Sequence, residues 1–138
     1  MTRKRRDELV FLPLGGAGEI GMNLNLYGYG PPGDETWVMV DLGVTFSDGA
    51  IPGVDVIMPD PGFIVERRDR LAGLFLTHAH EDHLGAVPYL WDRLRCPVYA
   101  TPFAISILRR KLAETTFADQ VEIIEVPLGG RVRLGPFD

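Results

Sequence analysis

The first half of the chain alternates short apolar runs with clusters of glycine, proline and aspartate, a pattern typical of strands and turns. Residues 9–14 form an apolar run, and residues 23–29 alternate weakly before a Pro-Pro-Gly-Asp turn, so these two segments predict a hairpin. Residues 36–40 are rich in β-branched and aromatic side chains and predict another strand. An irregular loop is predicted over residues 43–61, and a further short strand over residues 74–77.

The second half of the chain changes to a helical period. From residue 86 to residue 95, apolar side chains recur every three or four positions and predict an amphipathic helix. A buried strand is predicted at residues 96–100, followed by a second helix that Thr101 can cap. Residues 121–126 and 131–134 are strand-like and are predicted to form a closing hairpin. Strands followed by alternating strand and helix indicate a mixed α/β fold.

Composition and charge narrow the class of protein. The 138 residues are 46% hydrophobic and 24% charged, so one globular domain is expected. The net charge of -5 argues against a broad basic face for nucleic acid. No apolar stretch approaches the roughly 20 residues of a membrane helix, and no signal-peptide core follows the basic start, so we expect a cytoplasmic protein without a membrane partner. Because Cys96 is the single cysteine, a metal site would use histidine and carboxylate ligands.

Ionisable side chains are concentrated in the segment HAHEDH at residues 78–83, which contains all three histidines of the chain. In extended backbone, alternate side chains share a face, so His78 and His80 can bind one cation while the following turn directs Asp82 and His83 to a second position. Imidazole and carboxylate ligands suit zinc or manganese at neutral pH. A solvated polar turn is the alternative, but such a crowded set is poorly stabilised unless a cation is present.

Longer stretches around this segment resemble a known family. The sequence THAHEDHLGAVPYL, starting at Thr77, is similar to the HxHxDH signature of the metallo-β-lactamase superfamily, in the form found in the ribonuclease J family. The segments LPLGGAGEIGMN from Leu12, VDLGVTF from Val40 and IPGVDVIMPD from Ile51 are similar to further parts of that family. The resemblance covers nearly the whole chain and implies an αββα sandwich, here as an incomplete N-terminal part.

The resemblance also implies roles for individual side chains. His78 and His80 would bind one metal ion, Asp82 and His83 would bind a second, and Asp82 would also be a catalytic residue. Asp41 matches an acid that hydrogen-bonds and orients the metal ligands; without the resemblance it would be a turn-forming aspartate. Two divalent ions, zinc or alternatively manganese or magnesium, would activate a water for attack on a phosphodiester bond.

The substrate implied by the resemblance is RNA. Members of the family hydrolyse RNA as endonucleases and as 5′-to-3′ exonucleases in RNA processing and decay, and the products carry 5′-phosphate and 3′-hydroxyl ends. The complete protein would form a homo-oligomer. The alternative within the superfamily is another hydrolase, such as a glyoxalase-like thioesterase or a transfer-RNA processing nuclease. Glu81 and the GAVPYL continuation favour the ribonuclease J family.

The chain departs from the family after the motif. No histidine follows His83, although the complete site of the family uses further histidines and a bridging aspartate. Residues 1–8 are interpreted as a basic tail and residues 9–138 as the N-terminal part of a metallo-β-lactamase-like domain, without the β-CASP and C-terminal domains. We therefore expect negligible RNA hydrolysis by this chain alone. A noncatalytic metal- or RNA-binding module is the alternative for a chain with half of the ligands.

Three glycines near the start of the chain raise the possibility of a different function. Gly16, Gly18 and Gly21 satisfy the pattern GxGxxG after a strand, and Asp41 lies 20 residues beyond Gly21, as in a dinucleotide-binding site. Such a site needs a helix at the third glycine, for which the asparagines, glycines and prolines of residues 23–31 leave no room. The glycines would then form either a tight turn or a loop at the rim of the metal site.

Overall fold

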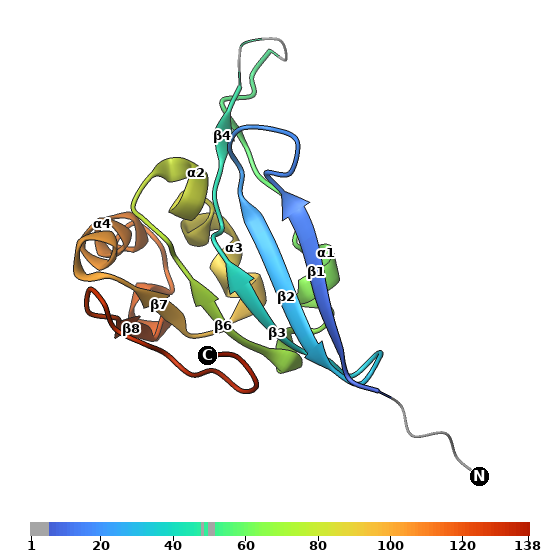
Figure 1. The fold of residues 1–138 in the computed structure, drawn as a ribbon. Coiled ribbons are helices and arrows are strands. Elements are labelled where there is room, and N and C mark those ends of the chain that lie inside the picture. The colour runs from blue at the N-terminus through green and yellow to red at the C-terminus, as the bar shows by residue number, and fades with distance from the viewer. Residues whose placement is uncertain (1–5, 48, 50–51) are drawn as a thin grey trace.

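The computed structural model describes residues 6–47, 49 and 52–138, which fold around a six-stranded sheet (Figure 1). The strands of this sheet, in spatial order, are β1 (Glu8–Gly15), β2 (Leu24–Gly30), β3 (Thr36–Val40), β6 (Leu71–Phe75), β7 (Val98–Ala100) and β8 (Ile123–Glu125). The first three strands are antiparallel neighbours, which confirms the predicted hairpin. The pairs β3-β6, β6-β7 and β7-β8 are parallel. The predicted mixed α/β class is therefore confirmed.

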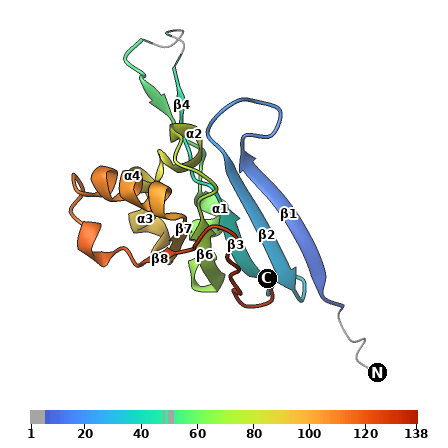
Figure 2. The same ribbon diagram turned by 60° about the vertical axis from the view of Figure 1, so that its left-hand side comes forward.

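Helices cover one face of this sheet (Figure 2). They are α1 (Gly62–Val65), α2 (Glu81–Leu84), α3 (Val87–Leu94) and α4 (Pro102–Leu112), with 3₁₀ turns η1 (Arg68–Arg70) and η2 (Ala118–Gln120). The buried residues of α3 and α4 recur at the predicted spacing: Val87, Leu90, Trp91 and Leu94, then Ala104, Ile105, Leu108 and Leu112. Pro88 and Pro102 both lie in a first helical turn, where no backbone N–H is required.

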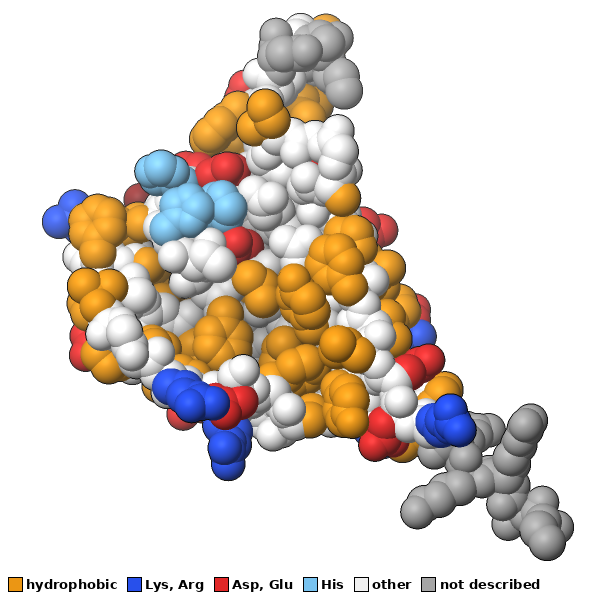
Figure 3. Space-filling view, in the orientation of Figure 1, with side chains coloured by type: hydrophobic (Ala, Val, Ile, Leu, Met, Phe, Trp, Pro, Cys, Tyr) orange, Lys and Arg blue, Asp and Glu red, His pale blue; other side chains and the backbone are white. Residues whose placement is uncertain are grey.

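The antiparallel half of the sheet has a covered face and an open face. In β2, Leu24 and Leu26 are fully buried in the core, whereas Tyr27 and Tyr29 on the opposite face are exposed. Hydrophobic side chains gather on this open side of the molecule (Figure 3). The alternation in residues 23–29 that predicted a strand therefore reflects burial on one face only.

The loop predicted over residues 43–61 contains a short ribbon, so that prediction was wrong in part. Strands β4 (Thr45–Phe46) and β5 (Val56–Ile57) pair antiparallel in a separate two-stranded sheet. A strand of two residues is too short to produce an alternating pattern, and its existence depends on a partner that is distant in sequence.

The predicted closing hairpin is wrong. Strand β8 pairs in parallel with β7, and residues 131–134 form no strand, although Leu134 makes an isolated bridge with Phe137. The segment after β8 turns back over the open face of the sheet, where Leu134 lines an apolar cavity together with Val38 and Phe75. Contact with this apolar face removes side chains from water, which a second exposed edge strand would not do.

The basic tail predicted at residues 1–8 falls largely outside the described residues, because residues 1–5 are among those not described. Strand β1 begins at Glu8, within that predicted tail. None of the helices in the described part of the chain has the length and apolar character needed to cross a membrane.

Candidate metal centre

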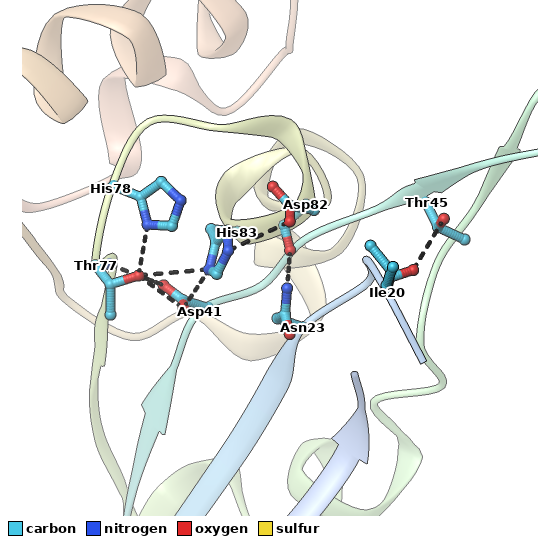
Figure 4. A network of polar contacts seen from close by, with 8 residues as sticks. All are labelled: Ile20, Asn23, Asp41, Thr45, Thr77, His78, Asp82 and His83. Atoms are coloured by element: carbon cyan, nitrogen blue, oxygen red, sulfur yellow. Dashed lines mark hydrogen bonds and ion pairs between the residues drawn. The ribbon is translucent and has the colours of Figure 1, made fainter. Parts of the chain in front are cut away.

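Three strand ends meet at one edge of the large sheet. Strands β3 and β6 are parallel, so their carboxyl ends lie at the same edge, and the antiparallel β2 begins there. Asp41 follows β3, Thr77 lies two residues after β6, and Asn23 precedes β2, and these side chains lie together at this edge (Figure 4). Strand β6 ends at Phe75, earlier than predicted, so the residues leading to α2 are not part of the sheet.

Three side chains of the predicted motif could share one ion. His78, Asp82 and His83 each offer a ligand atom, and these atoms all lie within 4.8 Å of one another. The ring centroids of His78 and His83 are 3.8 Å apart. His80 is outside this group, although its ring centroid lies 4.8 Å from that of His78, and the histidines form one surface patch (Figure 3). The motif predicted that His78 shares an ion with His80, whereas in the structure the ligand atoms of His78 lie near those of Asp82 and His83.

Asp41 lies beneath this group and contacts one of its members. Its side chain is buried, and its Oδ2 lies 2.7 Å from Nδ1 of His83. Thr77 donates its backbone N–H to Oδ1 of Asp41 at 2.8 Å, and its hydroxyl lies 2.8 and 2.9 Å from the two carboxylate oxygens. The backbone of Asp41 has φ 67°, a left-handed conformation that aspartate tolerates better than most residues. The buried carboxylate is therefore well supplied with donors.

The contact with Asp41 determines how the His83 ring can act. Because a carboxylate only accepts hydrogen bonds, Nδ1 of His83 carries the proton, and Nε2 of the neutral ring keeps its lone pair. That Nε2 lies 3.3 Å from Oδ2 of Asp82. Two acceptor atoms facing each other at this distance need a cation or a proton between them. The donor set of two imidazoles and one carboxylate therefore fits a divalent metal ion.

The backbone of α2 is held in place from two strand ends. Asn23 donates its backbone N–H and its Nδ2 to the carbonyl oxygen of Asp82, at 3.1 and 2.9 Å. Leu42 donates its N–H to the carbonyl oxygen of His83 at 2.8 Å. A Cβ at Gly43 would lie 1.8 Å from the carbonyl oxygen of Asp82, so this position needs glycine.

No role was predicted from the sequence for Thr77, Asn23 or Gly43. Each stands within a stretch that carries the family resemblance: Thr77 is next to His78, Asn23 precedes β2, and Gly43 lies two residues after Asp41. Their contacts join positions far apart in the chain, so local pattern alone could not reveal them. A glycine two residues after Asp41 was the one available signal of close packing.

The glycine pattern near the start of the chain does not open a helix. Gly16, Gly18 and Gly21 all have positive φ, and strand β2 follows them. The dinucleotide alternative is thereby excluded, since its third glycine must begin a helix. The loop is a turn that leads to the candidate site, because Asn23, two residues after Gly21, donates its backbone N–H to the carbonyl oxygen of Asp82 at 3.1 Å.

Two other side chains that could in principle bind a metal, Glu81 and Cys96, are in different environments. Glu81 forms an ion pair with Lys111 of α4. Burial raises the pKa of the Cys96 thiol to about 12, so the thiol is protonated at neutral pH and is unsuited to bind a metal. Both observations agree with a site built from histidine and aspartate.

A match to a known protein family agrees with a metal site at this edge of the sheet. Residues 25–136 match the Metallo-beta-lactamase superfamily, and the matched region includes Asp41 and the whole HAHEDH segment. The chain belongs to this superfamily. Membership implies divalent metal binding, for which the group of His78, Asp82 and His83 offers ligands.

Several curated proteins are similar to most of the chain. Ribonuclease J of Sinorhizobium meliloti is 52% identical over 131 residues, which cover 95% of this chain and 23% of that protein. Ribonuclease J 1 of Streptococcus pyogenes is 35% identical over 120 residues, which cover 87% of this chain and 21% of that protein. Ribonuclease J of Helicobacter pylori is 38% identical over 114 residues, which cover 83% of this chain and 16% of that protein. The resemblance found from the motifs is confirmed, and the chain spans less than a quarter of these relatives' length.

Proposed function

We propose that this sequence is part of a metal-dependent ribonuclease that hydrolyses phosphodiester bonds in RNA. The observation that carries the proposal is the grouping of His78, Asp82 and His83 above the buried Asp41. The 52% identity to a ribonuclease J supports RNA as the substrate. Endonucleolytic and 5′-to-3′ exonucleolytic cleavage, in RNA processing and decay, are the activities we propose for the complete protein.

In this proposal, the motif holds two divalent ions, zinc or alternatively manganese or magnesium. His78 and His80 would hold one ion and Asp82 and His83 the other, and Asp82 would also be a catalytic residue. When bound, such ions lower the pKa of a water molecule and neutralise charge that develops on the phosphodiester oxygens. The contribution of Asp41 is to hold the His83 ring with Nε2 directed toward Asp82, which keeps a ligand atom in place.

This chain supplies part of a ligand set. No histidine follows His83, so further ligands would come from residues outside this 138-residue segment. Two imidazoles and one carboxylate leave an ion with open positions that weaken its binding. We therefore propose that the 138-residue chain alone hydrolyses RNA negligibly. By the family resemblance, we also propose that the complete protein is a cytoplasmic homo-oligomer.

The test compares variants of the complete polypeptide that carries this sequence. We expect His78→Ala and Asp82→Asn each to lower hydrolysis of a 5′-labelled RNA by about 100-fold or more and to lower bound zinc or manganese, because each removes a ligand. Asp119→Asn, an exposed change in η2, is the matched control and should leave both unchanged.

The outcomes separate the alternatives. A wild-type protein that binds metal and RNA but does not cleave RNA would support a noncatalytic module instead. Cleavage of another class of substrate, with RNA left intact, would support another hydrolase of the superfamily. If both ligand variants kept full nuclease activity and metal content, the proposed site would be wrong.

A further inference from the structure

We propose that Thr77 is a positioning residue that fixes the tautomer of His78, so that this ring offers Nε2 to a metal ion. The inference rests on the proposed function, since it concerns how the same site is prepared for its ion. Thr77 lies between the end of β6 and the first histidine of the motif, with its hydroxyl between Asp41 and His78 (Figure 4).

Four contacts meet at the Thr77 hydroxyl. Its Oγ1 lies 2.9 Å from Oδ1 and 2.8 Å from Oδ2 of Asp41, and 3.1 Å from Nδ1 of His78. Nδ1 of His83 is farther away at 3.4 Å and has a closer partner in Asp41, at 2.7 Å. The relevant choice for the hydroxyl proton is therefore between Asp41 and His78.

The single hydroxyl proton goes to Asp41. Both oxygens of that carboxylate are acceptors, so a hydroxyl turned toward His78 would leave its own lone pairs facing them at 2.8 and 2.9 Å. A hydrogen bond to a charged acceptor is also stronger than one to a neutral imidazole nitrogen. Thr77 consequently donates to Asp41 and can only accept from His78.

His78 must then donate from Nδ1, which leaves the lone pair of the neutral ring on Nε2. That atom faces away from Thr77 (Figure 4). His83 is fixed in the same tautomer by direct contact with Asp41. One buried carboxylate thus orients both rings, directly for His83 and through the Thr77 hydroxyl for His78. Correct tautomers in the metal-free protein remove a rearrangement that binding would otherwise require.

The first test reads the tautomer without any metal or substrate. The complete protein, labelled with ¹⁵N-histidine and freed of metal, is measured by NMR at a pH where the imidazoles are neutral. We expect His78 protonated on Nδ1 in the wild type and in Thr77→Ser, which keeps the hydroxyl. In Thr77→Val, which keeps the shape and loses the hydroxyl, we expect a mixture of tautomers. A wild-type His78 protonated on Nε2 would overturn the proposal, even if the valine variant failed to fold.

The second test measures zinc or manganese affinity by competition with a chelator. We expect Thr77→Val to weaken binding about 10-fold and Thr77→Ser to restore it to within about 2-fold of the wild type. Thr115→Val is the matched control, because the Thr115 hydroxyl donates to the carbonyl oxygen of Leu112, away from the site. Equal affinities for the valine variant and the wild type would also overturn the proposal.

The two readouts separate this inference from the proposed function. If the wild-type protein cleaved no RNA while His78 kept the expected tautomer and the valine variant lost metal affinity, the proposed ribonuclease activity would fail and the role of Thr77 would stand. If RNA cleavage depended on His78 and Asp82 but not on the Thr77 hydroxyl, the role of Thr77 would fail alone.

Discussion

Two clusters of ionisable side chains lie at opposite ends of the same antiparallel strands. At one end are Asp41, His78, Asp82 and His83. At the other, Glu8 pairs in register with the last residue of β2, and Glu35 lies just before β3. Both ends bring carboxylates together, yet the two clusters have different chemistry.

The pKa values of the two glutamates shift in opposite directions. A side-chain hydrogen bond with Glu35 raises the pKa of Glu8. The pKa of Glu35 is lowered, chiefly by the hydrogen bond from its own backbone N–H, with further contributions from Glu8 and from the N–H of Gly33. The opposite directions of the two pKa shifts mean that Glu8 takes up a proton before Glu35 as the pH falls.

At the other end, Nε2 of His83 and Oδ2 of Asp82 face each other at 3.3 Å. Asp41 takes its hydrogen bonds from Thr77 and His83, and this directs Nε2 of His83 toward the carboxylate of Asp82. Neighbouring acidic residues are therefore by themselves a weak sign of a metal site. A stronger sign of a metal site is a set of imidazole and carboxylate lone pairs that converge on one position, with each ring oriented by a hydrogen bond to its other nitrogen.

The largest expected effect is on the close packing that holds α2 at the site. We expect Gly43→Ala to lower the free energy of unfolding by about 3 kcal/mol, because the added Cβ meets the backbone of Asp82 and His83, which cannot move aside as a side chain can. Urea unfolding measures this change. Gly62→Ala is the control, since its Cβ would meet only a side-chain oxygen of Asp60 at 3.1 Å. Equal losses for the two variants would show that Gly43 is not specially constrained.

A change at Asp41 should weaken the metal site. We expect Asp41→Asn to reduce metal affinity of the complete protein about 10- to 100-fold, or about 1.4 to 2.7 kcal/mol, because the amide group would oppose one of the donors from Thr77 or His83. Chelator competition measures the affinity. Asp34→Asn, which alters an exposed ion pair with Arg70, should have no effect on it. If Asp41→Asn bound metal as tightly as the wild type, Asp41 would not prepare this cluster for a metal ion, and the contrast with the glutamate pair would be lost.

The smallest expected effect concerns the glutamate pair. Since the pKa of Glu35 is lowered, its charged form stabilises the fold above the ordinary value of 4.5, and this stability is lost as pH falls through the lowered pKa. The raised pKa of Glu8 acts in the opposite sense, with its stability present below the ordinary value and lost as pH rises through the raised pKa.

Glu35→Gln should therefore reduce the change in unfolding stability that the wild type shows around and below pH 4.5. The effect is expected to be small, because the partner carboxyl group, Glu8, is exposed to solvent. Urea midpoints measured across this acidic range give the difference, with Glu125→Gln in β8 as the control. The same pH profile in the wild type and Glu35→Gln would argue against a pair coupled by a proton.

Local pattern was sufficient for elements that bury a regular stripe. The helical spacing of Val87, Leu90, Trp91 and Leu94 predicted α3, and the alternation of Leu24 and Leu26 with polar neighbours predicted β2. It was insufficient where pairing partners decide the structure. The ribbon of β4 and β5 and the parallel position of β8 depend on contacts between distant segments.

The same division holds for the candidate site. The residue types in HAHEDH are enough to indicate metal ligands, and the motif with its flanking segments is enough to indicate the superfamily. The grouping of His78 with Asp82 and His83, and the part played by Thr77, Asn23 and Gly43, could not be predicted from spacing along the chain.

The sequence by itself determined which chemical groups are present, where the two longer helices α3 and α4 and most strands form, and to which superfamily the chain belongs. Only the tertiary structure decided that Asp41, 36 residues before Thr77 in the chain, lies beneath the histidines and accepts hydrogen bonds from Thr77 and His83. The physical reason is that parallel pairing of β3 and β6 brings their ends together at one edge. Hydrogen-bond direction and tautomer depend on such contacts and not on neighbours in sequence.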